Sequence, residues 1–178
     1  MKLNMKPTAL SLMLVAGLMI AAPAAEAQKF VDEFDTIEIQ DGVGVGSGEV
    51  GEGHKAFRFT LEEDSAVNLE VVVTEVMQGT EYEDDDSILY VIDEDAELVA
   101  QDDDSGEGYA SRIERQPLEA GTYYAVVVTY GNEIRTSAGS GDLVKGFEDT
   151  GESRFAFDLR VETEGYFAGA LDALHETT

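Results

Sequence analysis

Carboxylates collect in the turns between apolar segments of this chain, and their residue types could bind a hard cation. The acidic run Glu83-Asp84-Asp85-Asp86 precedes one alternating segment, and Asp102-Asp103-Asp104 follows it. Several carboxylate oxygens on a rigid β scaffold are the ligands that Ca²⁺ prefers. Adjacent unpaired carboxylates raise one another's pKa, a penalty that a divalent ion relieves. Ca²⁺ is therefore the candidate cofactor, and its candidate ligands are Asp86, Asp102, Asp103 and Asp104.

The two acidic runs flank a predicted hairpin from Ser87 to Gln101, and we expect them at its opposite ends as separate metal positions. Neither run is an EF-hand: the sixth position from Asp93 is Leu98 where Gly is required, and the twelfth from Asp102 is Ile113 instead of a carboxylate. A calcium site would therefore be built from strand-connecting loops. The alternative is that the acids face water in turns, where Asp is favoured for hydrogen bonds to its own backbone.

A glycine-rich stretch, Gly46 to Gly51, satisfies the G-x-G-x-x-G pattern of dinucleotide-binding loops. Such a loop needs a helix N-terminus behind it, but an alternating segment begins at Lys55, and Glu49 and Glu52 would repel a pyrophosphate. We interpret the stretch as a flexible or bulged connection between two early strands, the first of them at Thr36 to Gln40.

Catalytic residue types show no convincing pattern. The chain has no Cys and two His, His54 and His175, so the residues do not indicate a zinc site. No G-x-S-x-G elbow is present. The many acids leave one enzymatic alternative, a small secreted hydrolase that uses loop carboxylates as an acid and base pair. We predict no catalytic residues and favour a non-enzymatic protein.

Period-two alternation of apolar residues predicts that the elements are strands. The alternating segments are Phe57 to Leu61, Val67 to Val73, Ile88 to Ile92 and Phe155 to Val161, and the short apolar run Leu98 to Ala100 is predicted to pair with the third of them as a hairpin. Thr122 to Tyr130 is nearly all β-branched or aromatic, which predicts a central strand buried on both faces. The predicted fold class is all-β: an antiparallel β-sandwich of about eight strands, closer to a jelly roll than to a βαβ fold.

Two later segments depart from this pattern. Gly131 to Ser153 is rich in Gly, Ser and Thr and is long enough to be a mobile functional loop. Phe167, Leu171 and Leu174 recur at helical spacing, which predicts a short C-terminal helix capping one end of the sandwich.

The N-terminal residues and the net charge limit the cellular location and the binding partners that the chain can have. Residues 1–27 have the basic start, apolar stretch and small-x-small ending of a signal peptide, so residues 28–178 are predicted to be one exported, periplasmic or extracellular domain. No second apolar run follows, so we expect no membrane insertion. With 38 acidic and 11 basic residues, the net charge of −27 would repel nucleic acid. A protein or polysaccharide surface is the predicted partner, and the sequence leaves the oligomeric state open.

The segment from Phe57 to Tyr130 resembles the bacterial pre-peptidase C-terminal domain family in the order and spacing of its motifs. The family pattern has an F-x-F-x-L strand, an Asp before an aliphatic-aromatic strand, a D-x-D-G turn, D-D near S-R-I, and L-x-A-G-T-Y-Y. The matching segments are Phe57 to Leu61, Asp86 to Tyr90, Asp93 to Ala96, Asp103-Asp104 with Ser111 to Ile113, and Leu118 to Tyr124. One departure is Ala96, which replaces the usual Gly of the turn.

This resemblance implies a β-sandwich accessory module, found beside secreted peptidases or in stand-alone exported proteins, with relatives that bind calcium and collagen. Combined with the residues, it predicts an exported, non-enzymatic binding or accessory module, stabilised by Ca²⁺, that interacts with a protein or polysaccharide.

Overall fold

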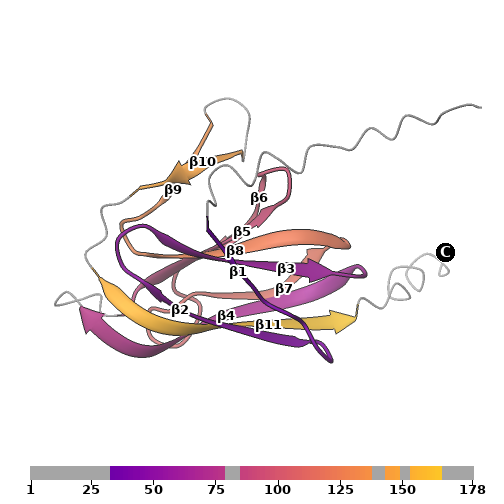
Figure 1. The fold of residues 1–178 in the computed structure, drawn as a ribbon, viewed down its shortest axis with the longest axis horizontal. Helices are drawn as coiled ribbons and strands as arrows, with labels where there is room; N and C mark the ends of the chain where they lie inside the picture. Colours follow the sequence, from indigo (N-terminus) through magenta and orange to yellow (C-terminus); the bar gives the residue numbers. More distant parts are fainter. Residues whose placement is uncertain (1–32, 79–84, 138–142, 149–152, 166–178) are drawn as a thin grey trace, which may run out of the picture.

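The computed structural model describes residues 33–78, 85–137, 143–148 and 153–165 (Figure 1). The predicted signal peptide, the predicted C-terminal helix with His175, and the acidic residues Glu83 and Asp84 lie outside these residues. Every element in the described ranges is a β-strand, which confirms the predicted all-β class. None of these ranges contains a helix of the length and apolarity needed to cross a membrane.

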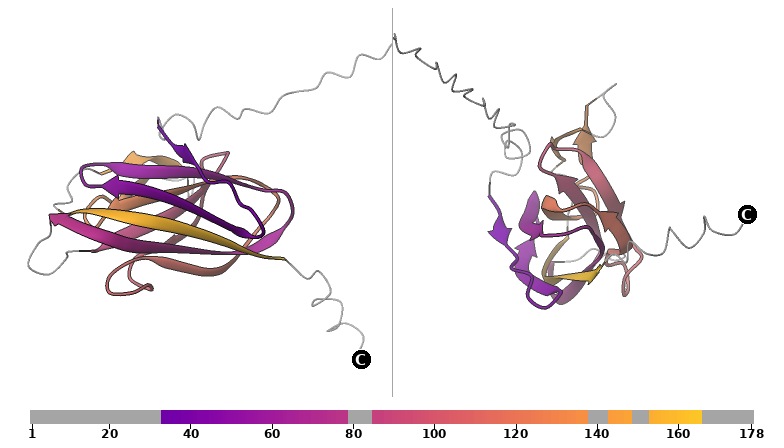
Figure 2. Two further views of the ribbon diagram at one scale, coloured as in Figure 1. Left: turned by 60° about the horizontal axis from the view of Figure 1, so that its bottom comes forward. Right: turned by 90° about the vertical axis from the view of Figure 1, so that its right-hand side faces the viewer.

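Two main sheets pack face to face as a sandwich (Figures 1 and 2). The first sheet has the order β1-β3-β8-β5-β6. Its strands are β1 (Asp35–Thr36), β3 (His54–Leu61), β8 (Gly121–Thr129), β5 (Ser87–Asp93) and β6 (Leu98–Asp102). The second sheet has the order β2-β11-β4-β7. Its strands are β2 (Val43–Val50), β11 (Arg154–Gly165), β4 (Ser65–Gln78) and β7 (Arg112–Leu118). The main-sheet pairs are antiparallel except β1 with β3.

The inward-facing residues of both sheets form the core that holds the sandwich together. Phe57 of β3 meets Phe157 of β11 edge to face, with ring centroids 6.0 Å apart. Both rings are fully buried, as are Phe59 in β3 and Phe155 and Leu159 in β11, which point to the same face. Because alternate side chains point to the same face of a strand, the period-two pattern of the sequence is the pattern of this core. The four strands predicted from that pattern correspond to β3, β4, β5 and β11, and the short apolar run predicted to pair with the third of them corresponds to β6.

The outer face of the first sheet is covered as well. Val126 and Val128 of β8 point to this face and are buried, while Ala125 and Val127 are buried on the opposite face. The prediction of a central strand buried on both faces is therefore confirmed. The cover includes a small third sheet, β9 (Ile134–Thr136) with β10 (Val144–Phe147).

This small sheet corrects the prediction of a structureless loop from Gly131 to Ser153. Val144 of β10 is 1% exposed, and the ring of Phe147 lies 5.9 Å from that of Tyr90. The apolar residues that anchor β9 and β10 are few and widely spaced in a polar segment, so the sequence showed no regular period there.

The glycine-rich stretch is also ordered: it forms the second half of β2 and the turn after it, and not merely a bulged connection. A Cβ on Gly46 would lie 2.6 Å from the Phe57 ring. Glycine therefore allows the β2 backbone to approach a core phenylalanine closely. Eight residues of β2 pair with β11, from Val43 with Glu162 to Val50 with Phe155.

β7 contains a bulge, and its pairing with β4 covers only the first part of that longer strand. Arg115 has φ of 52°, and its N–H donates to the Asn68 side chain at 2.7 Å. The pairing of β7 with β4 shifts register there and reaches Glu70 opposite Arg112. One further bond follows, from Val71 N–H to the Ser111 carbonyl at 3.0 Å. Beyond it β4 continues to Gln78 alongside β11 alone among the described strands.

Candidate functional site

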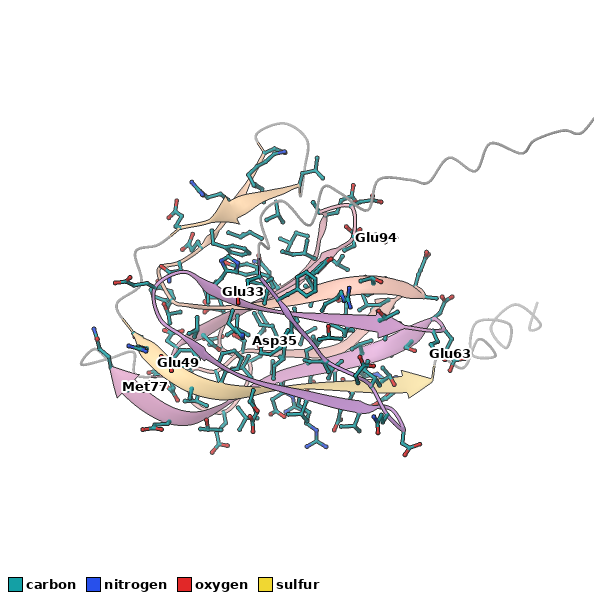
Figure 3. The ribbon with its side chains drawn as sticks, in the orientation of Figure 1. Glu33, Asp35, Glu49, Glu63, Met77 and Glu94 are labelled. Carbon is teal, nitrogen blue, oxygen red and sulfur yellow. The ribbon has the colours of Figure 1, made fainter. Side chains whose placement is uncertain are left out.

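The β5–β6 hairpin brings the described residues of the two acidic runs, Asp85 and Asp86 before β5 and Asp102 to Asp104 after it, to the same end of the sandwich. Leu89 pairs with Asp102, so Asp86 just before β5 and Asp102 at the end of β6 both lie at the hairpin's open end. The expectation of separate metal positions at opposite ends is therefore wrong, because antiparallel pairing brings the two ends of a hairpin together. The closed turn with Glu94 lies at the other end, away from Met77 of β4 (Figure 3).

Asp102 stabilises the loop that follows it. Its Oδ2 accepts hydrogen bonds from the backbone N–H of Ser105 at 3.1 Å and of Arg112 at 2.7 Å. These bonds close the loop between β6 and β7 over the open end. One oxygen of this candidate calcium ligand is thus already engaged by its own loop.

Asp103 lies in a cluster of like charges. Burial raises the pKa of its carboxyl, and the negative charges of Asp104, Asp102 and Glu133 raise it further. Glu133 comes from the segment before β9, so no spacing in the sequence links it to the acidic turn. A cation beside Asp103 would relieve this repulsion.

Asp86 is 8% exposed, and its carbonyl accepts a hydrogen bond from the Tyr130 N–H at 3.0 Å. It thereby joins the start of β5 to the end of β8. Within the described ranges, no three His, Asp or Glu side chains converge closely enough to hold a metal ion. The four candidate ligands share one end of the molecule but do not form an assembled donor set among those residues, and calcium binding stays a prediction.

Two buried serines join the sheets beneath the open end. Ser87 of β5 and Ser111 before β7 are both fully buried. Their hydroxyl oxygens lie 2.8 Å apart, Ser111 N–H donates to Ser87 Oγ at 2.9 Å, and Ser111 Oγ donates to the Ser87 carbonyl at 2.6 Å. Each serine belongs to one of the motifs on which the family resemblance was based: Ser87 to the motif from Asp86 to Tyr90, and Ser111 to the motif from Ser111 to Ile113. Their role is to hold the two sheets at a fixed separation here.

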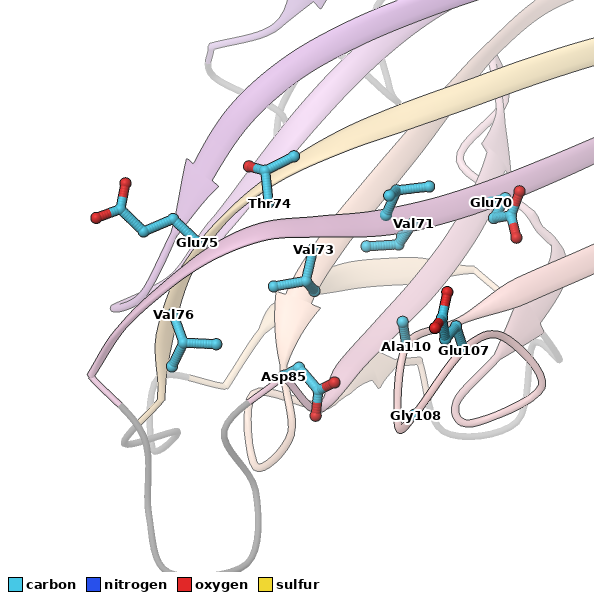
Figure 4. A pocket seen from close by; sticks show the side chains of 11 residues that line it. Glu70, Val71, Val73, Thr74, Glu75, Val76, Asp85, Glu107, Gly108 and Ala110 are labelled. Atoms are coloured by element: carbon cyan, nitrogen blue, oxygen red, sulfur yellow. The ribbon is translucent and has the colours of Figure 1, made fainter.

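A groove of about 550 Å³ lies beside the unpaired part of β4 (Figure 4). Val71, Val73 and Val76 line it from the strand. Asp85 and the loop residues Glu107, Gly108 and Ala110 lie across from them, and Glu70 and Glu75 complete its carboxylates. Gly108 has φ of +72°, and a Cβ there would lie 2.6 Å from Asp85 Oδ2. A left-handed glycine therefore allows this loop to close against Asp85.

The charges of this groove differ from those of its neighbours. A larger hollow near β2 contains Arg154, which pairs with Glu49, and another contains Arg115, which pairs with Glu164. The residues lining the β4 groove include four carboxylates and no Lys, Arg or His. Glu70 also lines the hollow that contains Arg112 and Arg160, whereas Glu75, Asp85 and Glu107 line the β4 groove alone and have no arginine in its lining.

Exposed apolar and aromatic side chains gather at the same end. Val72, Val76 and Met77 of β4 are 44%, 44% and 41% exposed. Tyr109 and Tyr130 are 53% and 45% exposed, and they lie close in sequence to the loop and strand ends that join here. Sequence reasoning missed this surface, because it depends on β4 continuing beyond β7.

No protein-family model matches this sequence, and no curated protein matches it. Among solved structures, the chain is similar to the pre-peptidase C-terminal domain of a collagenase from Bacillus anthracis, with 13% identity and a TM-score of 0.46 over 73% of this chain and 95% of that chain. It is also similar to PliG, a periplasmic lysozyme inhibitor of g-type lysozyme. The Aeromonas hydrophila protein has 13% identity and a TM-score of 0.37 over 74% and 98% of the two chains. The Salmonella Typhimurium protein has 10% identity and a TM-score of 0.38, again over 74% of this chain and 98% of that chain. The first of these structures belongs to the family that the sequence motifs resemble.

Proposed function

We propose that this chain is an exported, non-enzymatic module that binds a protein through the open end of its sandwich. The observation that carries the proposal is that exposed Val72 and Val76 line an acidic groove at this end, with exposed Met77 next to them on β4 and exposed Tyr109 in the facing loop. Tyrosine and methionine are enriched in protein interfaces, where a buried apolar contact is ringed by polar groups. The hydrogen bonds between Ser87 and Ser111, and those that Asp102 accepts from its loop, order this surface before any partner binds. This order lowers the entropic cost of binding.

The residues of the groove favour binding over hydrolysis. Apart from its carboxylates, the groove offers Thr74 as a side-chain hydroxyl, and its lining includes no His or Lys that could activate it. Carboxylate-based glycoside hydrolysis needs one acid kept protonated beside one kept ionised. The carboxyl whose pKa burial and neighbours raise is Asp103, which is exposed and is not part of the groove lining.

The binding function is tested with the purified chain immobilised and exposed to the exported proteins of its source cell. We expect a protein to be retained saturably and displaced by free folded chain, but not by unfolded chain. In parallel, peptide, ester and glycoside substrates are assayed for turnover. Hydrolysis that is lost in Asp85→Asn/Glu107→Gln would replace this proposal with the hydrolase alternative.

Calcium stabilisation is a separate part of the proposal and has its own test. The cation would lie near Asp103, where its charge would offset the repulsion among Asp102, Asp104 and Glu133. At about 100 times its dissociation constant, Ca²⁺ should raise the free energy of unfolding by about 2.7 kcal/mol. A calorimetric melting curve that a chelator leaves unchanged would rule this out.

A further inference from the structure

The unpaired edge of β4 offers backbone hydrogen-bonding groups as well as side chains. Val71 N–H forms the last bond to β7, and residues that alternate along a strand share an edge, so the Val73 N–H and carbonyl face the space that β7 has left. From Val72 to Met77, the described strands pair with β4 on its β11 side alone. This segment is about 20 Å long, enough for the extended core of a peptide.

An edge of this kind is a template for another strand, and natural proteins usually protect it with charge, proline or a covering loop. This edge has apolar residues, with Val72, Val76 and Met77 all more than 40% exposed. A strand added here would lie on the same edge of β4 that pairs with β7 between Ser65 and Glu70. Its inward side chains would pack on Val71, Val73 and Val76.

The charges around the edge select the added strand. Asp85 and Glu107 lie on the far side of the groove, and Glu75 lies on β4 in the open part of the strand (Figure 4). Both faces of an added strand would therefore meet carboxylates. A second copy of this chain would bring the same acidic residues and another net charge of −27, so like charges would oppose edge-to-edge pairing. A segment with lysine or arginine alternating with apolar residues would be attracted.

We propose that the open edge of β4 from Val72 to Met77 binds an extended, basic segment of a partner protein as an added β-strand. This inference rests on the proposed function and specifies its mode: main-chain pairing supplies affinity, and the carboxylates select positive charge.

The direct test is a titration of the full chain with a synthetic peptide of alternating lysine and valine, long enough to cover Val72–Met77. A peptide with glutamate in place of lysine serves as the charge control. Two further peptides carry backbone N-methyl groups, one on every valine and one on every lysine. Because a strand pairs through one edge, and alternate residues share that edge, one N-methylated peptide should bind like the parent and the other should not.

Two charge-reversal variants locate the binding site. Glu75→Lys/Glu107→Lys changes one carboxylate on each side of the groove, and both positions are exposed. The matched control is Glu62→Lys/Glu63→Lys, which makes the same change at exposed positions just before the other end of β4 (Figure 3). We expect the groove variant to lose affinity for the parent peptide about tenfold, and the control to lose less than about threefold.

The inference is overturned if the glutamate peptide binds as well as the lysine peptide, or if both N-methylated peptides bind like the parent. It is also overturned if the two charge variants lose affinity equally, or if sedimentation shows a dimer of this chain that excludes the peptide. Retention of an exported protein without peptide binding at this edge would leave the proposed function standing and remove this mode of binding.

Discussion

Replacing Ser87 with alanine tests the bridge that holds the open end together. The substitution removes the acceptor of the Ser111 N–H bond and the partner of the Ser111 hydroxyl, at 2.9 and 2.8 Å, in a site where both serines are 0% exposed. A buried donor left without a partner costs about 1–3 kcal/mol. We therefore expect Ser87→Ala to lower the free energy of unfolding by about 2 kcal/mol.

The reverse substitution should cost about as much. Because Ser111 Oγ donates its one proton to the Ser87 carbonyl, Ser87 Oγ is the donor of the 2.8 Å bond between the two hydroxyls. Ser111→Ala therefore leaves the buried Ser87 hydroxyl without its acceptor, and the expected cost is again about 2 kcal/mol. The double variant should cost little more than Ser87→Ala alone, because the two hydroxyls belong to one network.

Urea denaturation followed by tyrosine fluorescence and circular dichroism measures all three variants. Ser105→Ala is the control, because Ser105 is exposed and donates its backbone N–H, not its hydroxyl, to Asp102. We expect the control to stay within about 0.5 kcal/mol of the natural chain. A double variant whose cost equals the sum of the two single costs would refute the reasoning, as would a Ser87→Ala variant as stable as the control.

Two further predictions concern the turn of the β5–β6 hairpin and the acidic cluster. Ala96 has φ of 72° and is 4% exposed, a backbone conformation in which a β-branched side chain is strained. In urea denaturation, Ala96→Val should lower the free energy of unfolding by about 2 kcal/mol, and Ala96→Gly should change it by less than about 1 kcal/mol. Equal stability of the Val and Gly variants would contradict this prediction. The raised pKa of Asp103 means that the folded chain binds its proton more tightly than the unfolded chain does, so this carboxyl contributes less to stability as the pH rises above its usual value of 3.8. Without calcium, Asp103→Asn should therefore raise the melting temperature near neutral pH, and the gain should vanish in acid; a gain that persists or grows below that range would contradict the assignment.

The sequence predicted those parts of the fold whose side chains alternate strictly. β3 and β11 could be found because alternate side chains of each lie in the core, and β5 and β8 because both of their faces are buried and their residues are nearly all apolar. β2 was not predicted as a strand because Gly46 has no apolar side chain to show the period; its role is to let the backbone approach Phe57 closely. A pattern of apolar side chains does not reveal a strand whose core contact is made by the backbone of a glycine.

β7 was missed for a different physical reason. The left-handed Arg115 breaks its alternation, and Pro117 lowers its strand propensity. The same bulge shifts the register against β4, but the pairing continues past it to Arg112 opposite Glu70. The open edge of β4, which shapes the candidate site, follows instead from the difference in strand length, because β4 continues to Gln78 while β7 begins at Arg112.

The sequence identified the acidic turns that flank the β5–β6 hairpin but not that they lie at the same end of the sandwich. Asp102 caps its own loop there, and Asp86 is largely buried. Glu133 joins the Asp103 cluster from a distant part of the chain. Which carboxylates share a neighbourhood depends on strand register, and composition carries no information about register.

Hydrogen exchange at the Val73 amide tests most directly whether the open end of the sandwich binds by strand addition. In the free chain this amide faces the unpaired edge and should exchange rapidly, whereas the Val126 amide in the centre of β8 should exchange slowly. Saturation with the lysine–valine peptide should slow exchange at Val73 at least about tenfold and leave Val126 unchanged. Peptide binding without any added protection at Val73 would contradict the account.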